Sequence, residues 1–353
     1  MKYDCIIIGI GIAGISTAIH LNKLNKNLKI LIIDKYKFPR NKLCAGYLTL
    51  KSVDLLKELG IKVEKYDYRL VKGITISYKN KIRIKANNHG LYCQKLIDRT
   101  VLDYEMFKQL KKIKIDIKQT TQINDLNKEE SYVLIDNIKY YYKYLIFADG
   151  QLGYSSKFNN ERKKYFAMQM NFKQKEKEKI QMYFGITKKG YAWEASSGDY
   201  INIGFCDLYN KKTDYMKIFE DFVKQLGYKY NKTQVKGFYV PYGIKKTKII
   251  NNNIYLIGDA VGSVDPLTLA GISYAINTGK YVSKSIIKNN NKIYLNYLKK
   301  LQIKFRILKI MGGILYNKIT LFIFIRVGGH FFGKLFTYIL DRFILWNKGS
   351  FHE

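Results

Sequence analysis

The chain has 353 residues, of which 47% are hydrophobic and 15% aromatic, and its formal net charge is +34. A chain of this length and composition buries a sizeable core and has room for two domains, which excludes a disordered protein. The four cysteines lie far apart with no Cys-x-x-Cys pair, so neither a disulfide framework nor a metal site is expected. A reducing cytoplasmic location is favoured.

The positive charge has two interpretations. Most basic residues are lysines, and they are spread along the whole chain, which favours a bias of composition. The alternative is an anionic partner: a membrane surface, a nucleic acid or a phosphorylated substrate. Among these anionic partners, the strongest candidate is anionic lipid, contacted peripherally at the inner face of the membrane. The sequence shows no nucleic-acid recognition motif, so no nucleic acid is expected.

The first 34 residues predict a nucleotide-binding unit. An apolar run at 3–8 predicts a buried parallel strand, and the pattern Gly9-x-Gly11-x-Ala13-Gly14 leads into a helix. Gly9 permits the tight turn, Gly11 lets the backbone approach a pyrophosphate, and Gly14 lets the helix pack closely. The pyrophosphate would lie at the helix N-terminus. A second strand ends on Asp34, whose carboxylate can accept hydrogen bonds from a ribose.

Two later strands end in an acid beside a glycine. The strand at 143–147 leads to Ala148-Asp149-Gly150, at the end of a sheet where ligands gather. The strand at 254–257 leads to Gly258-Asp259-Ala260, and Gly271 opens a helix over 272–287. An acid at this point can bind ribityl hydroxyls. The helix N-terminus can stabilise negative charge that develops on a reduced flavin.

Between and after these motifs the pattern predicts a second sheet and a helical tail. We expect a helix at 50–59 capped by Gly60, strands within 66–93, and a helix from 98 with acids in its first turn. Alternating aromatic segments over 164–242 predict an antiparallel sheet with one helix near 214–226. The tail at 291–353 has too many charges for a spanning helix, so its helices pack on the core or lie on a membrane.

Together these motifs resemble the geranylgeranyl reductase family of FAD-dependent oxidoreductases, whose fold is similar to p-hydroxybenzoate hydroxylase. The loop Lys42-Leu-Cys44-Ala45-Gly46 is similar to that family's Lys-x-Cys-Gly-Gly, and Tyr191-Ala-Trp193 to its Tyr-x-Trp-x-Phe-Pro. Three departures place the substrate pocket in doubt more than the flavin. They are Ala45 for the first loop glycine, residues 194–196 for x-Phe-Pro, and 269–272 for Gly-Glu-Gly-Ile.

The resemblance implies an α/β fold in which a Rossmann-type domain with a parallel sheet carries FAD and an antiparallel sheet forms the substrate domain. The implied FAD-binding domain is discontinuous and comprises residues 1–68, 94–160 and 245–290. Residues 69–93 and 161–244 would form the substrate domain, and 291–353 a C-terminal helical region.

The resemblance also implies roles for individual residues. Cys44 would lie near the reactive face of the flavin, and Tyr191 and Trp193 would line the substrate cavity; a structural thiol and plain core aromatics are the alternatives. The cofactor-binding set is Gly9, Gly11, Ala13, Gly14, Asp34, Lys35, Arg40, Cys44, Ala45, Arg99, Asp149, Gly258, Asp259, Pro266, Gly271 and Ile272.

The expected activity is a non-covalent FAD-dependent reduction, in which hydride passes from the flavin to a carbon–carbon double bond of a prenyl-type or other apolar lipid. No second glycine fingerprint predicts a nicotinamide domain, which disfavours disulfide reductases that bind two dinucleotides. The electron donor would be NAD(P)H, reacting transiently, or a ferredoxin-like protein. A flavin monooxygenase or hydroxylase on the same fold is the alternative. An RNA-binding flavoprotein is a more distant one.

Overall fold

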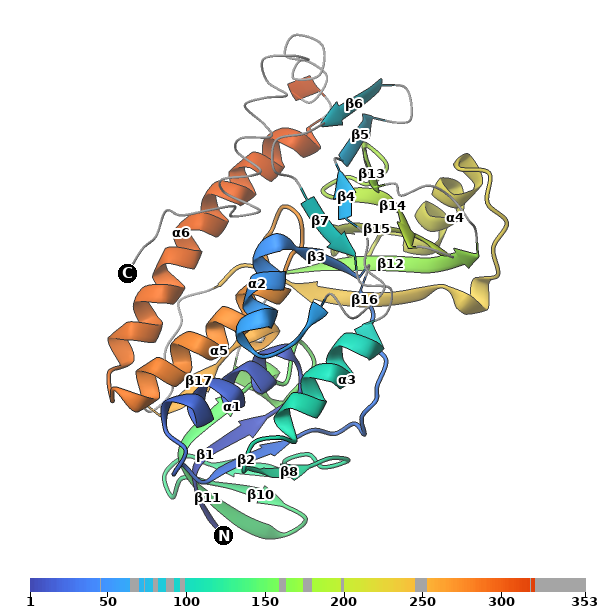
Figure 1. Ribbon diagram of the computed structural model, residues 1–353. Coiled ribbons are helices and arrows are strands. Elements are labelled where there is room, and N and C mark those ends of the chain that lie inside the picture. The colour runs from blue at the N-terminus through green and yellow to red at the C-terminus, as the bar shows by residue number, and fades with distance from the viewer. Residues whose placement is uncertain are drawn as a thin grey trace.

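Two sheet-based units and a long C-terminal helix make up the molecule (Figure 1). The computed structural model describes residues 1–44, 46–63, 70–72, 74–78, 82–86, 92–95, 99–158, 163–173, 180–197, 200–244, 253–317 and 319–320. The glycine turn belongs to the lower unit in Figure 1, and the larger antiparallel sheet to the upper one. Helix α6 runs along the side of both units.

The lower unit is built on a seven-stranded sheet whose central strands are parallel. Its order is β8-β2-β1-β11-β10-β9, and β17 also pairs with β11. The parallel strands are β1 (Lys2–Ile8), β2 (Ile30–Ile33), β8 (Asp116–Lys118), β11 (Ile138–Phe147) and β17 (Ile254–Leu256). The antiparallel strands are β9 (Asp125–Asn127) and β10 (Tyr132–Ile135). The carboxyl ends of β1, β2, β11 and β17 therefore meet at one edge.

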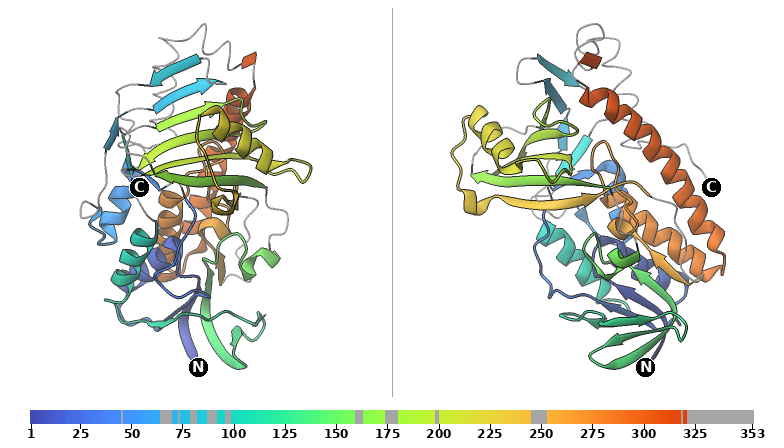
Figure 2. Two further views of the ribbon diagram at one scale, coloured as in Figure 1. Left: turned by 90° about the vertical axis from the view of Figure 1, so that its right-hand side faces the viewer. Right: turned by 180° about the vertical axis from the view of Figure 1, so that it is seen from behind.

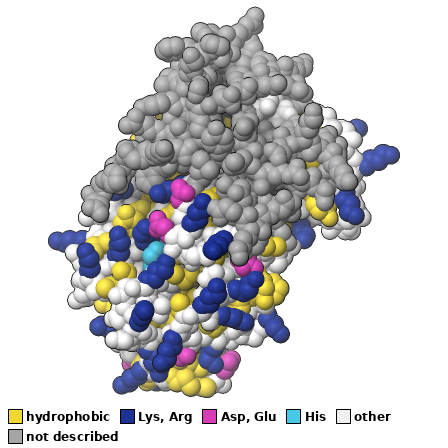
Figure 3. All heavy atoms as spheres, in the orientation of Figure 1, with side chains coloured by type: hydrophobic (Ala, Val, Ile, Leu, Met, Phe, Trp, Pro, Cys, Tyr) yellow, Lys and Arg dark blue, Asp and Glu magenta, His cyan; other side chains and the backbone are white. Residues whose placement is uncertain are grey.

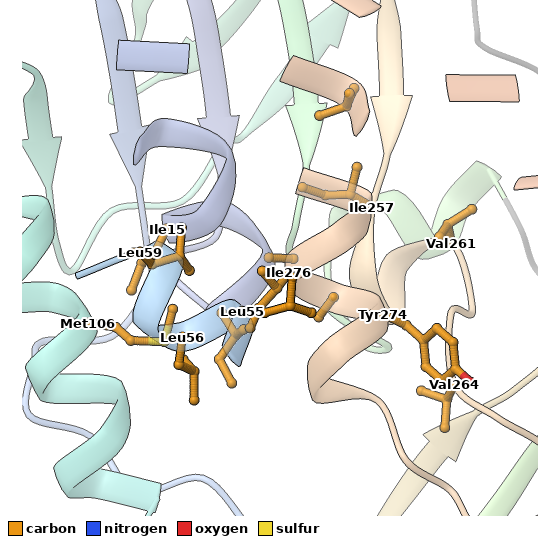
Figure 4. Close-up of a cluster of buried hydrophobic side chains, with 14 of the residues drawn as sticks. Ile15, Leu55, Leu56, Leu59, Met106, Ile257, Val261, Val264, Tyr274 and Ile276 are labelled. Atoms are coloured by element: carbon orange, nitrogen blue, oxygen red, sulfur yellow. The ribbon is translucent and has the colours of Figure 1, made fainter. Parts of the chain in front are cut away.

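Helices bury one of the two apolar faces of this sheet. They are α1 (Ile12–Leu24), α2 (Leu50–Glu58), α3 (Arg99–Leu110) and α5 (Ile272–Ile287). Figure 4 shows side chains from all four helices in one buried cluster, including Ile15, Leu56, Met106 and Ile276. Helices α1 and α5 approach so closely that a Cβ on Gly279 would lie 2.8 Å from Thr17 Oγ1. The two helices carrying the predicted cofactor motifs thus form one packed pair.

The upper unit is a second seven-stranded sheet, whose strands lie one above another in the left view of Figure 2. Its order is β16-β12-β15-β14-β13-β5-β6. The strands are β5 (Ile74–Tyr78), β6 (Ile82–Ala86), β12 (Lys164–Lys173), β13 (Ile180–Phe184), β14 (Tyr191–Ser197), β15 (Tyr200–Leu208) and β16 (Lys236–Pro241). Helix α4 (Tyr215–Gln225) covers one face through Phe219, Phe222 and Val223. A small sheet of order β3-β7-β4 consists of β3 (Tyr47–Thr49), β7 (Tyr92–Lys95) and β4 (Leu70–Lys72).

The C-terminal part described by the structure consists mainly of helix α6 (Asn291–Tyr316), followed by residues 317 and 319–320. It docks on the lower unit, where the Tyr281 and Tyr297 rings stack at 4.1 Å and the Tyr294 hydroxyl donates to Leu256 O at 2.6 Å. Within the described residues, no helix combines the length and apolarity that crossing a membrane requires. The rest of the predicted tail, 321–353, lies outside the described residues.

The predicted fold class is confirmed: a parallel nucleotide-binding sheet, a second mainly antiparallel sheet and a C-terminal helix. One local prediction is wrong. Helix α3 begins at Arg99 and has no acid in its first turn, because Asp103 lies a full turn later and pairs with Arg99 instead of the helix N-terminus. Asp98 lies outside the described residues. The domain boundaries stay a prediction, and β4 and β7 join β3 in the small sheet.

Candidate nucleotide-binding and redox site

The predicted glycine turn forms at the carboxyl end of β1. Gly9 has a φ of 110°, and a Cβ there would lie 2.5 Å from Ala148 O. A Cβ on Gly14 would lie 1.9 Å from Gly9 O, so the helix can pack on the turn only without a side chain. A Cβ on Gly11, by contrast, would have Arg40 Nη2 as its nearest neighbour, at 3.8 Å. Gly11 is therefore open, on the side that a ligand would occupy.

Asp34 fastens the turn to the second strand. Its Oδ2 accepts from the backbone N–H of Ile10 at 2.7 Å, and its Oδ1 accepts from Tyr36 at 2.8 Å. The side chain is buried at the carboxyl end of β2, one strand away from the glycines. Each oxygen keeps a second lone pair, so a ribose contact is compatible with both hydrogen bonds. The ribose role itself stays a prediction.

Arg40 and Arg99 converge on one buried acid, Asp103. Arg99 donates through Nε at 2.9 Å and Nη2 at 2.7 Å to Asp103 Oδ1, and Arg40 Nη2 lies 3.7 Å from Oδ2. Burial opposes the charged form of Arg99, but Asp103 and then Cys44 more than offset it and raise the pKa of Arg99. The predicted residues Arg40, Arg99 and Cys44 thus belong to one cluster.

The Gly258-Asp259 turn meets the first glycine turn directly. Gly258 has a φ of 58°, and a Cβ there would lie 2.8 Å from the Cβ of Ala13 in α1. Asp259 is partly exposed and lies 3.7 Å from Lys42 Nζ, which links it to the basic loop after β2. A Cβ on Gly271 would lie 3.9 Å from Asp259 Oδ1. The N-termini of α1 and α5 therefore flank the same edge of the sheet.

The loop that opens α5 is fixed by three tyrosines and one acid. The hydroxyls of Tyr165, Tyr316 and Tyr191 donate to three consecutive carbonyls, those of Pro266 at 3.1 Å, Leu267 at 3.0 Å and Thr268 at 2.6 Å. Asp265 is fully buried and accepts from the N–H groups of Leu267 and Thr268 at 2.7 and 3.1 Å.

This fixation offsets a backbone cost. Leu269 has a φ of 57°, a left-handed conformation that costs a side-chain-bearing residue about 1 kcal/mol. The family resemblance places a glycine at this position. The hydrogen bonds around Asp265 and the tyrosines therefore hold a conformation that glycine would adopt freely.

Tyr191 and Trp193 project from β14 on the same face of the upper sheet, with ring centroids 6.0 Å apart. Burial raises the pKa of Tyr191 well above its ordinary value, so the hydroxyl stays protonated as a donor to Thr268. Trp193 Nε1 donates to Asn202 Oδ1 at 2.6 Å. On β12, which β15 separates from β14, Gln169 Nε2 donates to Cys44 O at 3.4 Å. Tyr191 and Cys44 are thus both hydrogen-bonded across the junction of the two units, Tyr191 to the loop that opens α5 and Cys44 to β12 of the upper sheet.

Some predicted residues are less central. Lys35 is exposed and lies over the Tyr36 ring at 5.1 Å. Asp149 accepts from Ser155 N and Oγ at 2.8 and 2.5 Å, which gives its carboxylate a local structural partner beside the site. Ile272 is partly buried in the first turn of α5. Ala45 lies outside the described residues.

The sequence reading missed Asp103, Asp265 and the tyrosines Tyr165 and Tyr316. The only signal for Asp103 was its spacing of four residues from Arg99, which places both on one helix face. Asp265 precedes Pro266 and is followed by Thr268, a pattern typical of an Asx turn. Nothing local in the sequence singles out Tyr165 or Tyr316 among 31 tyrosines.

The residues fit the diphosphate of FAD by three observations. The N-cap of α1 is Gly11, which leaves the first helix N–H groups without a side-chain cap, and these favour an anion. Gly11 has open space. Arg40 Nε is buried and has no hydrogen-bond partner within the described part of the chain, although its guanidinium points at Gly11. A phosphate oxygen would satisfy that donor.

Comparison with known proteins also indicates a flavoprotein oxidoreductase. A family model for pyridine nucleotide-disulphide oxidoreductases matches residues 3–182. An uncharacterized protein of Methanosarcina barkeri is 31% identical over 295 residues, 81% of this chain and 74% of that protein. A digeranylgeranylglycerophospholipid reductase of Methanococcus aeolicus is 26% identical over 316 residues, 82% of this chain and 78% of that enzyme.

A solved structure has the same fold. It is a geranylgeranyl bacteriochlorophyll reductase-like protein of Thermoplasma acidophilum, with a TM-score of 0.72 and 19% identity, and the match covers 97% of this chain and 96% of that one. The chain belongs to the pyridine nucleotide-disulphide oxidoreductase family and is an FAD-dependent oxidoreductase. Within that class it is of the geranylgeranyl reductase type.

Proposed function

We propose that this enzyme reduces carbon–carbon double bonds of a prenyl-type or similarly apolar lipid. The observation that carries the proposal is the junction of the two units, where Tyr191 of the upper sheet donates to Thr268 O at 2.6 Å in the loop that opens α5. An aromatic sheet face therefore borders the predicted isoalloxazine position. The digeranylgeranylglycerophospholipid reductase that the chain resembles is named for an isoprenoid lipid.

When bound, FAD supplies the hydride for such a reduction. The residues of this chain orient the cofactor and shape the substrate cavity. The glycine turn and Arg40 would hold the diphosphate, and Asp259 would bind the ribityl chain. Tyr191 is a positioning residue, because its hydroxyl is committed to Thr268 O. Cys44 lies beside Arg99, and its Sγ accepts from Gly46 N at 3.4 Å. Its proposed place near the reacting atoms comes from the family resemblance.

The test is anaerobic turnover. The FAD-loaded enzyme is reduced with dithionite and mixed without oxygen with geranylgeranyl-type lipids, and products are identified by mass spectrometry. A saturated product supports the reductase. A product that forms only with oxygen and carries an added oxygen atom would show that the enzyme is a hydroxylase and not a reductase. A parallel single-turnover measurement of Cys44→Ser should show slower flavin reoxidation by the lipid with FAD content unchanged, and an unchanged rate would return Cys44 to a structural role.

The electron donor is also a proposal: NAD(P)H or a ferredoxin-like protein. The sequence contains one glycine fingerprint, at Gly9, which serves FAD. A nicotinamide would therefore bind transiently or not at all. Anaerobic mixing with NADPH, NADH or a reduced ferredoxin, followed at the flavin absorption band, separates the three donors.

We also infer that α6 touches an anionic membrane surface. Ile303, Ile307 and Ile310 share one helix face and are 60%, 40% and 67% exposed. Basic residues interleave with them on the exposed side, namely Lys299, Lys300, Arg306 and Lys309. An apolar stripe among long cationic side chains suits the boundary between acyl chains and lipid headgroups. Such a surface would present an apolar lipid to the enzyme.

A further inference from the structure

A pocket of about 700 Å³ lies where the start of β12, the β13–β14 turn, the end of β15 and the C-terminal part of α6 meet. Five lysines line it: Lys163, Lys164, Lys188, Lys189 and Lys309. No acidic residue occurs among the described lining residues. Within the described part of the chain, none of these amines lies at ion-pair distance from a carboxylate, although Lys188 interacts electrostatically with the buried Asp207.

The floor of the pocket is aromatic and packed against the fold. Tyr165 and Tyr242 are 5% and 6% exposed and contact each other with ring centroids 4.8 Å apart. Tyr165 also donates to Pro266 O at 3.1 Å, and Pro266 itself lines the pocket. The same proline is predicted to face the isoalloxazine. The pocket therefore shares a wall with the predicted redox site.

The fold positions the Lys164 side chain and the backbone of Lys188 and Lys189. Lys164 Nζ lies over the rings of Tyr239 and Tyr209 at 4.2 and 4.8 Å. The turn that carries Lys188 and Lys189 is fixed through its backbone, since both N–H groups donate to the buried carboxylate of Asp207 at 3.4 and 2.8 Å. Asp207 also accepts from Leu208 N at 2.9 Å. Its oxygens are thus committed to backbone donors.

Ammonium groups that line one pocket repel one another, and a bound anion removes that cost. A cleft lined by one sign of charge also concentrates ions of the opposite sign. Lysine is a common ligand of phosphate, and an apolar floor suits the organic part of a phosphorylated molecule. On the face shown in Figure 3, Lys and Arg side chains are spread over the lower unit.

We propose that this five-lysine pocket binds the phosphate or diphosphate group of an organic phosphate whose apolar part extends past the Pro266 loop toward the redox site. Two sources share that chemistry: a phosphorylated headgroup of the lipid substrate and the phosphates of a nicotinamide dinucleotide donor. Phosphate binding stands on the pocket alone, whereas the link to the substrate rests on the proposed function.

The experiment is calorimetric titration of the oxidised, FAD-loaded full-length protein, which requires no turnover. The probes are a prenyl diphosphate, the corresponding prenyl alcohol, inorganic pyrophosphate and NADPH. The test variant is Lys188→Ala/Lys189→Ala/Lys309→Ala, which leaves the backbone contacts of Asp207 in place. The control is Lys211→Ala/Lys212→Ala/Lys217→Ala, three exposed lysines in and before α4 with the same change of net charge.

The test variant should bind the phosphorylated probe about tenfold or more weakly, because each lost ammonium–phosphate contact changes the affinity several-fold even when exposed. The control should change the affinity by less than about twofold, since screening suppresses distant charges. Preference for the prenyl diphosphate over the alcohol and NADPH assigns the pocket to the substrate headgroup, and preference for NADPH assigns it to the donor.

Equal affinities of the test and control variants for the phosphorylated probe would contradict phosphate binding at this pocket. Equal binding of the prenyl alcohol and the prenyl diphosphate would also contradict it. Circular dichroism and FAD content verify that each variant is folded. A pocket that binds phosphate in a protein that fails the anaerobic reductase test would keep this inference and remove only the proposed reaction.

Discussion

Asp103 is a buried carboxylate between two guanidinium groups, one from its own helix and one from the loop after β2. It is 1% exposed, and Arg99 and Arg40 are 6% and 14% exposed at their side chains. Charges so far from water are stabilised only by mutual pairing. The arrangement also leaves Arg40 Nε without a hydrogen-bond partner in the described chain. The positively charged guanidinium of Arg40 therefore lies beside Gly11 with this free donor. The acid therefore orients an arginine for an anion that it does not itself touch.

Asp103→Asn should lower the free energy of unfolding of the FAD-free protein by about 3–5 kcal/mol, because two buried guanidinium groups lose their shared countercharge. Urea unfolding followed by circular dichroism measures it. The matched control is Glu130→Gln, which removes a surface pair with Lys139 at 3.6 Å and should cost less than about 1 kcal/mol. If the two variants lost the same stability, the buried pairing would have no special weight.

Substitutions at Gly11 and Gly14 should have different effects, one on flavin binding and the other on folding, although the two residues are three positions apart. Gly11→Val should yield a folded protein that purifies colourless, because the added side chain has room in the protein but occupies the path of the pyrophosphate. Gly14→Ala should reduce soluble, folded protein, because its Cβ would lie 1.9 Å from Gly9 O. Flavin absorbance per protein and circular dichroism separate the outcomes. A yellow Gly11→Val protein with full flavin content would contradict the assignment.

At the scale of the elements, the sequence predicted what local periodicity encodes. The apolar run of β1, the glycine turn, α1 and the later α5 were all visible, and α5 covers Ile272–Ile287 as expected. The short strand β9 was not visible, because its three residues carry no periodic pattern. Contacts such as that of Tyr165 with Pro266 join residues 101 apart, and no local signal specifies such a pair.

Helix α6 carries a prediction of its own. Ile303→Ser/Ile307→Ser/Ile310→Ser should reduce co-sedimentation with anionic vesicles several-fold, because three exposed apolar side chains lose their transfer into the lipid boundary. Vesicles of phosphatidylglycerol and phosphatidylcholine provide the assay, and neutral vesicles show the part due to charge. The control, Leu24→Ser/Ile138→Ser/Leu152→Ser, removes three exposed apolar side chains elsewhere. Equal loss in both variants would remove α6 as the contact surface.

At the scale of the whole molecule, the candidate cleft is built from segments far apart in the chain. The turn at 9–14, the loop at 34–44, the start of α3 and the loop at 258–271 meet only when the lower sheet is complete. The upper sheet then fixes the last of these through Tyr165 and Tyr191. A ligand that spans this cleft therefore binds the folded chain and has no comparable site in the unfolded one.

FAD should accordingly raise the thermal midpoint of the whole protein. At a free concentration of about 1,000 times Kd, the linkage contributes about 4 kcal/mol. FAD-stripped protein is heated with increasing FAD, and unfolding is followed by far-ultraviolet circular dichroism so that both sheets report. The midpoint should climb by several degrees in the parent protein and stay constant in Gly11→Val. A shift confined to FAD fluorescence, with the circular dichroism transition unmoved, would mean that the flavin closes only a local site and does not couple the two units.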